Sequence, residues 1–315
     1  MQAIVMEEFG GPEVLRPAEV PDPVPGPGQV LVAVEYAGIT FVETQVRAGR
    51  GPAGMPVPQL PRVPGNGVGG RVVATGPDVD PGLVGTTVVT TTGGAGGYAQ
   101  LAVAAAADVL PVPGGLALPD AVALLADGRT AVMLHRQATP QPGEWVLVEA
   151  AAGGVGSLLV QLAVAAGARV VGAAGGAEKA AFAGSLGAVG VDYSRPGWEH
   201  EVVAATGGRG VDLVYDGVGG RLGAQGMAAV RPGGRAQVYG MASGGWTEVP
   251  AGVDVVKGGA PTPAEIRAFA AEALAAAAAG RLRPVIGQTF PLADAARAHR
   301  AIEARATTGK TLLVP

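Results

Sequence analysis

The sequence predicts an α/β fold in two parts, a β-rich barrel-like domain and a doubly wound parallel sheet. Short apolar strands separated by Pro- and Gly-rich turns occupy the first 120 residues. Strands and helices alternate from about Asp120 onward, and one of these strands enters a helix through a glycine-rich turn. The chain has 315 residues, of which 48% are apolar, so it can build two domains with substantial cores.

Strands of the barrel-like part have alternating or continuous apolar patterns. The turns between them are rich in proline and glycine, as in PDPVPGPGQ at residues 21–29. The predicted strands are residues 2–6, 29–39, 67–76, 86–91 and 98–104.

The second part begins with a helix over residues 119–138. A βαβ unit follows, with a strand at Trp145–Glu149, a tight turn at Ala151–Gly156, a helix at Ser157–Ala166 and a strand at Arg169–Val171. Next come a helix at 178–188 and strands at 188–192, 211–219 and 235–240. After Gly244 the pattern is irregular, and then predicts two helices and a closing strand at 310–315.

The glycine-rich turn is the strongest functional signal. A right-handed strand–turn–helix–strand unit leaves the unpaired N–H groups and positive dipole end of its helix facing a bound phosphate. Gly153 permits close approach of the backbone, and Gly156 lets the helix pack on the strand. The turn departs from GxGxxG because Ala151 stands first, and 53 glycines make chance matches common, so a βαβ unit without ligand is the alternative. The predicted pyrophosphate contacts are Ala152, Gly153, Gly154, Val155 and Gly156.

Residues after the next strand indicate which dinucleotide is bound. An NAD site usually has Asp or Glu about twenty residues past the turn, whereas Ala173–Gly176 offers no carboxylate and Lys179 lies just beyond. A lysine ammonium would pair with a 2′-phosphate, whereas a carboxylate at this place would repel it. The pattern therefore favours NADPH. If Glu178 faces inward instead of Lys179, NADH is favoured. Alternatively, both are only first-turn charges of a helix.

Composition excludes several other classes. The chain has no cysteine, and its three histidines lack partners at ligand spacing, so we expect no metal. A net charge of −4 with dispersed Lys and Arg argues against nucleic-acid and membrane partners. The N-terminus has no signal-peptide pattern, and no apolar run reaches membrane-spanning length; the alanine-rich helix at Ala268–Ala279 reads as surface-docked. These features predict a cytoplasmic protein.

The chain resembles the zinc-independent medium-chain dehydrogenases/reductases of the quinone oxidoreductase, or zeta-crystallin, type. The likeness covers nearly the whole chain and depends on blocks in the family's order. They are VLVAVEYAGITFVETQVRAG, VPGNGVGGRVVATG, GGYAQ at 96–100, DGRTA at 127–131, AAGGVG at 151–156, VDLVYDGVGG and GKTLLVP. The resemblance implies a discontinuous GroES-like catalytic domain, residues 1–120 and 250–315, around a Rossmann NADPH-binding domain, residues 121–249.

The resemblance also implies roles for individual residues. Thr130 would lie by the nicotinamide, Gly175 and Gly176 would form the phosphate loop, and Lys179 with Tyr193 would contact the 2′-phosphate. Further cofactor contacts would come from Tyr239, Gly240, Met241 and Ala242, and contacts with nicotinamide and substrate from Ile39, Thr40 and Phe41. The alternatives are that Thr130 caps or packs a helix, that Tyr193 is a half-buried strand residue and that Phe41 is core.

The chain departs from the family's pattern at several positions. Thr40 stands where asparagine is common, Glu43 where aspartate is common, and Gly176 where serine or threonine is common. The segment at 48–61 lacks the family's tyrosine near the substrate mouth, so no proton donor and no catalytic residue can be named. The segment Gly244–Pro261 looks shorter than usual at the expected dimer edge, which leaves a homodimer as a possible outcome of the resemblance.

The expected reaction is hydride transfer from NADPH to an electron-poor acceptor, with a quinone as the first choice. The alternative acceptor is the β-carbon of an α,β-unsaturated carbonyl, as in enone or enoyl reductases. A second alternative is a non-catalytic NADPH-binding protein. Without zinc to polarise a carbonyl, an alcohol dehydrogenase mechanism lacks its Lewis acid. The physiological substrate is not encoded in any motif.

Overall fold

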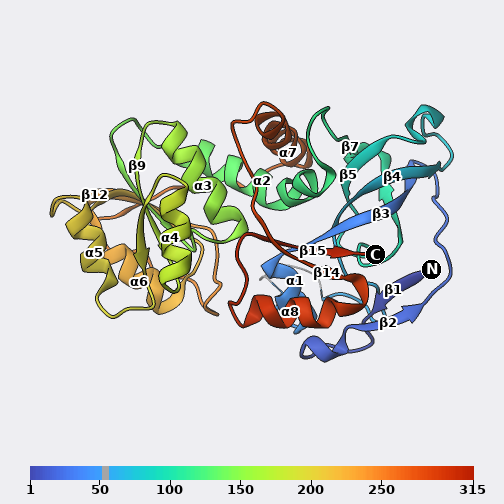
Figure 1. The fold of residues 1–315 in the computed structure, drawn as a ribbon, viewed down its shortest axis with the longest axis horizontal. Helices are drawn as coiled ribbons and strands as arrows, with labels where there is room; N and C mark the ends of the chain where they lie inside the picture. The colour runs from blue at the N-terminus through green and yellow to red at the C-terminus, as the bar shows by residue number, and fades with distance from the viewer. Residues whose placement is uncertain (52–56) are drawn as a thin grey trace. The chain divides into compact units, whose positions relative to one another are not determined.

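The computed structural model describes residues 1–51 and 57–315, and its chain forms two compact units (Figure 1). One unit consists of Met1–Asp127 with Ala270–Pro315, and the other of Gly128–Phe269. The domain limits at residues 120 and 250 stay predictions. The segment at 48–61, in which we expected no tyrosine donor, includes residues 52–56, which lie outside the described residues.

The first unit is built on a seven-stranded sheet in the order β14-β15-β3-β4-β5-β7, with β6 paired to β3. Strand β3 at Gln29–Ile39 has the alternating pattern expected from its sequence and pairs with three neighbours, all antiparallel. The remaining strands are β4 (Gly67–Thr75), β5 (Thr87–Thr91), β6 (Leu101–Ala105), β7 (Leu110–Pro111), β14 (Ile286–Pro291) and β15 (Lys310–Val314), with β1 (Gln2–Val5) and β2 (Arg16–Glu19) as a separate pair.

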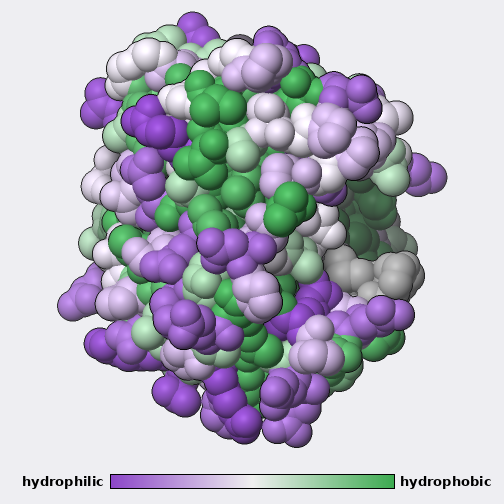
Figure 2. Space-filling view, turned by 90° about the vertical axis from the view of Figure 1, so that its right-hand side faces the viewer, coloured by the Kyte–Doolittle hydropathy of each residue, from purple (hydrophilic) through white to green (hydrophobic). Residues whose placement is uncertain are grey.

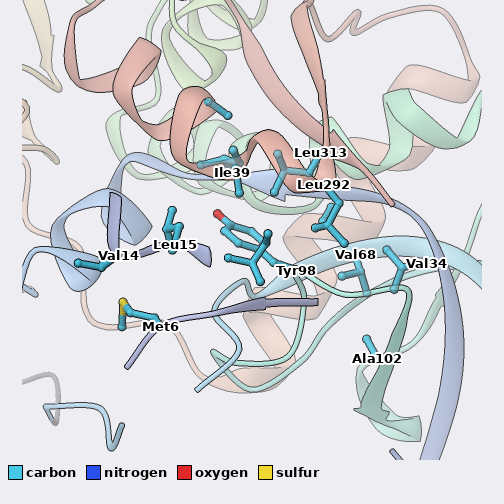
Figure 3. Packing of buried hydrophobic residues seen from close by; sticks show 14 residues of the cluster. Met6, Val14, Leu15, Val34, Ile39, Val68, Tyr98, Ala102, Leu292 and Leu313 are labelled. Atoms are coloured by element: carbon cyan, nitrogen blue, oxygen red, sulfur yellow. The ribbon is translucent and has the colours of Figure 1, made fainter. Parts of the chain in front are cut away.

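The C-terminal segment completes this unit. Strand β15 lies antiparallel to β3, so that Leu313 is opposite Ala37. Tyr98, fully buried, lies at the centre of the core cluster, and Figure 3 shows Ile39, Leu292 and Leu313 around it. Burying these side chains from both ends of the chain holds the discontinuous unit together. Its helices are α1 (Phe41–Arg47) and α8 (Ala295–Glu303), and helices α2 (Leu118–Ala138) and α7 (Pro263–Ala278) run across the unit limits.

One face of the molecule carries exposed apolar side chains. Figure 2 shows patches of hydrophobic residues separated by polar ones on this face. The exposed valines include Val24 at 85% and Val57 at 77%. Single exposed apolar side chains of this kind are ordinary on a protein surface.

The second unit is a six-stranded parallel sheet in the order β10-β9-β8-β11-β12-β13. Its strands are β8 (Trp145–Glu149), β9 (Arg169–Ala174), β10 (Val189–Asp192), β11 (Val211–Asp216), β12 (Val230–Val238) and β13 (Asp254–Val255), and its helices α3 (Gly154–Ala165), α4 (Ala177–Ser185), α5 (Trp198–Ala205) and α6 (Gly220–Ala228). From β8 the chain continues to β9 and β10 on one side of β8, and then crosses to β11 on the opposite side of β8. The carboxyl ends of β8 and β11 therefore form the switch point at which doubly wound sheets bind ligands.

The structure corrects two predicted boundaries in the βαβ unit. Helix α3 begins at Gly154, whereas the tight turn was expected to continue to Gly156. Strand β9 extends to Ala174 rather than ending at Val171. Glycine is a poor helix former, so a pattern based on propensity starts the helix too late, whereas sheet packing supports the additional turn.

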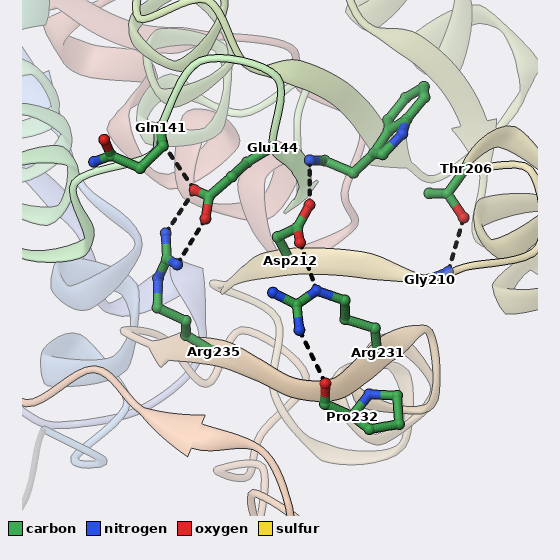
Figure 4. A network of polar contacts seen from close by, with 9 residues as sticks. Gln141, Glu144, Thr206, Gly210, Asp212, Arg231, Pro232 and Arg235 are labelled. Atoms are coloured by element: carbon green, nitrogen blue, oxygen red, sulfur yellow. Dashed lines mark hydrogen bonds and ion pairs between the residues drawn. The ribbon is translucent and has the colours of Figure 1, made fainter.

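Ion pairs link neighbouring strands of this sheet near their amino-terminal ends (Figure 4). Arg235 donates two hydrogen bonds to the Glu144 carboxylate, at 2.8 and 2.7 Å. The Asp212 carboxylate accepts from the Trp145 backbone N–H at 2.7 Å and from Arg231 at 2.5 Å. These contacts join β8, β11 and β12 at the end opposite the switch point.

Candidate functional site

The glycine-rich turn is shaped by close backbone packing. Ala150 follows β8 with a φ of +50°, and the chain then reaches Gly153, the residue that caps α3. A Cβ atom on Gly156 would lie 2.2 Å from the Ala150 carbonyl oxygen, a distance that no side chain tolerates. Glycine at this position therefore lets α3 pack directly against the end of β8.

The start of α3 is suited to an anion. The helix has twelve residues, no side-chain cap at its N-terminus and no acidic residue in its first turn. Its first N–H groups therefore have no capping side chain, and the helix dipole adds partial positive charge there. Ala152 is buried, whereas Gly153, Gly154 and Val155 are partly exposed. These residues could hold the pyrophosphate of a dinucleotide.

The loop after β9 brings together most of the predicted 2′-phosphate contacts. Gly176 is the N-cap of α4 and has a φ of +91°. Lys179 is half-buried in the first turn of that helix, whereas Glu178 is exposed. The Tyr193 ring lies against Gly175, where an added Cβ would be 3.2 Å from a ring carbon, and meets Trp198 edge to face. The structure thus gathers Gly175, Gly176 and Tyr193 in one place.

Sequence reasoning missed Asp192, the last residue of β10, which contacts this loop. Its carboxylate accepts the Gly176 backbone N–H at 2.7 Å, so it holds the loop between β9 and α4. Hydrogen bonds from Ser194 and from Gly176 keep the pKa of Asp192 below its ordinary value. The available signal was a carboxylate at the end of an apolar strand, but only sheet pairing places it beside Gly176.

The predicted contacts at Tyr239–Ala242 follow the end of β12. The backbone N–H groups of Tyr239 and Ala242 donate to the carbonyls of Asp216 at 2.8 Å and Gly217 at 3.4 Å. A Cβ on Gly240 would lie 2.5 Å from the Gly217 carbonyl oxygen. The loop is thus held tightly against the residues that follow β11, at the carboxyl edge of the sheet. Thr130 lies in α2, partly exposed.

Ile39, Thr40 and Phe41 belong to the first unit and are consecutive at the junction of β3 and α1. Ile39 is buried in the core cluster, with 3% of its surface exposed. Thr40 is the N-cap of α1, and Phe41 lies under the Arg305 guanidinium, 4.8 Å from it. Packing in the core explains why an apolar residue stands at Ile39. The predicted contact of Ile39, Thr40 and Phe41 with substrate stays a prediction.

Thr40 is held by the neighbouring Glu43 carboxylate. This carboxylate accepts the backbone N–H of Thr40 at 2.6 Å, its hydroxyl at 2.9 Å and the N–H of Asn66 at 2.9 Å. Removal from water raises the pKa of Glu43, although these donors and Lys310 oppose the change. Lys310 is itself buried and pairs with Asp127 at 3.0 Å. Glu43 therefore fixes the conformation of the Thr40 backbone.

The donor set does not fit zinc. Within residues 1–51 and 57–315, no three His, Cys, Asp or Glu side chains gather as a metal-binding group. A catalytic zinc needs three protein ligands and an open position. No step of the reaction is therefore assigned to this metal.

Comparisons with known proteins agree with this architecture. Residues 26–114 match the alcohol dehydrogenase GroES-like domain, and residues 186–313 match the zinc-binding dehydrogenase family. A quinone oxidoreductase of Pseudomonas aeruginosa is 36% identical over 98% of this chain and 97% of its own. A 2-haloacrylate reductase of a Burkholderia species is 34% identical over 100% of this chain and 99% of its own. Escherichia coli quinone oxidoreductase, solved with NADPH, superposes with a TM-score of 0.90 at 31% identity, covering 100% of both chains.

A GroES-like unit combined with a Rossmann-type parallel sheet defines an oxidoreductase of the medium-chain dehydrogenase/reductase class. Within that class, the chain belongs to the quinone oxidoreductase, or zeta-crystallin-like, family. In the described part of the chain, no helix has both the length and the apolar character needed to span a membrane.

Proposed function

We propose that this protein is an NADPH-dependent oxidoreductase that transfers a hydride to a quinone without zinc. The observation that carries the proposal is the start of α3, which lies without a capping side chain at the switch point of a doubly wound sheet. The relatives from Pseudomonas aeruginosa and Escherichia coli named as quinone oxidoreductases, the latter solved with NADPH, support the choice of cofactor and acceptor.

Each part of the site has a proposed task. The N–H groups at Ala152–Gly156 bind the pyrophosphate, and Lys179 with Tyr193 and the Gly175–Gly176 loop binds the 2′-phosphate. Thr130 and the loop Tyr239–Ala242 orient the nicotinamide end, and Ile39, Thr40 and Phe41 contact the acceptor. When bound, NADPH supplies the hydride, and the protein's task is to hold and orient it.

Water supplies the proton in this proposal. Glu43, the carboxyl nearest to Thr40, already accepts three hydrogen bonds, so we give it the task of holding Thr40 and not of donating a proton. Reduction of a quinone by one hydride needs one further proton to form the hydroquinone. No side chain is assigned as its source.

The test is NADPH oxidation by the purified protein, followed by nicotinamide absorbance. A matched panel of ortho- and para-quinones is compared with α,β-unsaturated ketones and aldehydes, with NADH in parallel. Faster turnover with quinones and with NADPH is the expected result. Tight NADPH binding without turnover on any acceptor would instead favour the non-catalytic alternative.

A second candidate function is reduction of an activated carbon–carbon double bond. The Burkholderia relative, named 2-haloacrylate reductase, is 34% identical and matches the whole length of this chain. Such an acceptor would need the same cofactor and a different substrate pocket. Preference for enones over quinones in the panel would select this function.

We further propose that the enzyme works in the cytoplasm as a homodimer. Membership of the family motivates both parts. Light scattering of the purified protein at several concentrations tests the dimer, and a mass corresponding to one chain at all concentrations would contradict it.

A further inference from the structure

Two buried carboxyl groups meet at the switch point of the second unit. Glu149 ends β8 and Asp216 ends β11, and both side chains are fully buried. The strands are parallel with Tyr215 opposite Val148, so the next residues along each strand are Asp216 and Glu149. Neither carboxyl was singled out by the sequence patterns, yet together they lie beneath the predicted cofactor edge.

Asp216 acts as an acceptor for several segments at once. Its Oδ1 accepts the backbone N–H groups of Val218 at 2.9 Å and Gly219 at 2.7 Å. Its Oδ2 accepts the hydroxyl of Thr247 at 2.5 Å. A carboxyl that accepts from three donors serves best in its ionised form, so the negative charge of the pair belongs on Asp216.

Glu149 is the second carboxyl group of the pair. Neither of its oxygens has a hydrogen-bond partner of ordinary geometry among the described residues. Burial, followed by the nearby Asp216, raises the pKa of Glu149 well above its ordinary value. Asp216 is the charged group that faces it, Ala173 is its partner on β9, and Gly226 of α6 lies against its carboxyl.

The segment anchored by Asp216 supports the loop that follows β12. Ser243 donates its N–H to the Val218 carbonyl at 2.8 Å and its hydroxyl to the Gly219 carbonyl at 2.9 Å. Thr247 closes the same loop by its bond to Asp216. The predicted cofactor contacts Tyr239–Ala242 lie within the loop at residues 239–247, so their position depends on this anchor.

We propose that Asp216 is a positioning residue, which holds the loop at 239–247 in place for NADPH through Thr247. This inference rests on the proposed function, because the loop is assigned there to the cofactor. Asp216 itself does not touch the reacting atoms. Its carboxylate accepts donors from its own turn and from the loop.

The anchor is tested first without cofactor, by amide hydrogen exchange at Tyr239, Ala242 and Ser243. Thr247→Val should lower the protection of these amides about tenfold, since a hydrogen bond to a charged group is lost. Thr247→Ser keeps the hydroxyl and should restore it. Unchanged protection in β8 and β9 shows that each variant is folded.

The consequence for the cofactor is tested by NADPH titration of the same variants. Thr247→Val should raise the Kd about tenfold, and Thr247→Ser should remain near wild type. Equal affinity of Thr247→Val and wild type would overturn the inference. Failure of the wild-type protein to bind NADPH would refute the proposed function. The exchange data would still show whether Asp216 holds the loop at 239–247 through Thr247.

Discussion

The hydroxyl of Tyr98 lies 3.0 Å from Nε2 of His299, although 201 positions separate the two residues in the sequence. Both side chains are fully buried, and their rings meet edge to face at 5.8 Å between centroids. Tyr98 lies shortly before β6 in the sequence, and His299 lies on α8. This contact attaches the C-terminal helix to the core formed by the N-terminal strands.

His299 should make the protein sensitive to acid. Burial, followed by the Arg47 charge, lowers the pKa of His299 from 6.5 to about 3. The unfolded chain therefore binds the additional proton first, and stability is lost as the pH falls from about 6.5 toward 3, by at most about 1.4 kcal/mol per pH unit. Denaturant unfolding between pH 7 and pH 4 measures this slope. His299→Gln should flatten it, whereas the control His200→Gln, at a side chain that is 84% exposed, should not.

Lys179 should discriminate between the two nicotinamide cofactors. Lys179→Ala is expected to raise the KM for NADPH about 10- to 100-fold and to leave that for NADH nearly unchanged, because only NADPH carries the 2′-phosphate. Glu178→Gln is the control on the adjacent exposed residue. Steady-state kinetics with both cofactors measure the effect, and equal losses for NADPH and NADH would show that the 2′-phosphate assignment is wrong.

Gly156 should tolerate no side chain. The Cβ of Gly156→Ala would lie 2.2 Å from the Ala150 carbonyl oxygen, so α3 must move away from β8. We expect a loss of about 2 kcal/mol or more in the free energy of unfolding and a marked loss of NADPH affinity. Gly184→Ala is the matched control, because nothing lies within 4 Å of its Cβ position. The control should be neutral or slightly stabilising, since alanine is the better helix former.

The Glu144–Arg235 pair should contribute measurably to stability. The side chains are 17% and 28% exposed, and their contact is bidentate, so Glu144→Gln leaves a partly buried guanidinium without its counter-charge. A loss of about 1–3 kcal/mol is expected from thermal or denaturant unfolding. Asp294→Asn breaks the exposed pair with Arg297 and should change stability by less than about 0.5 kcal/mol. Similar losses for both variants would contradict this interpretation.

Local patterns predicted most of the second unit. The strand at Trp145–Glu149 is confirmed, because five consecutive mostly apolar residues between turns encode a buried strand without reference to the rest of the chain. The helix at Phe41–Arg47 and the strand at Ile286–Pro291 were missed. Both are short, and the seven-residue helix depends on the bond between Thr40 and Glu43 at its N-terminus.

The sequence by itself determined the two-part α/β fold and the glycine-rich turn before α3, because apolar period and turn chemistry act over a few neighbouring residues. Only the tertiary structure decided that β15 joins β3, that Asp192 holds Gly176 and that Glu149 lies beside Asp216. These relationships depend on the pairing of strands that are distant in sequence. Carboxylates at strand ends cannot be distinguished in the sequence. Their burial and their hydrogen-bond partners differ because segments distant in sequence pack around them.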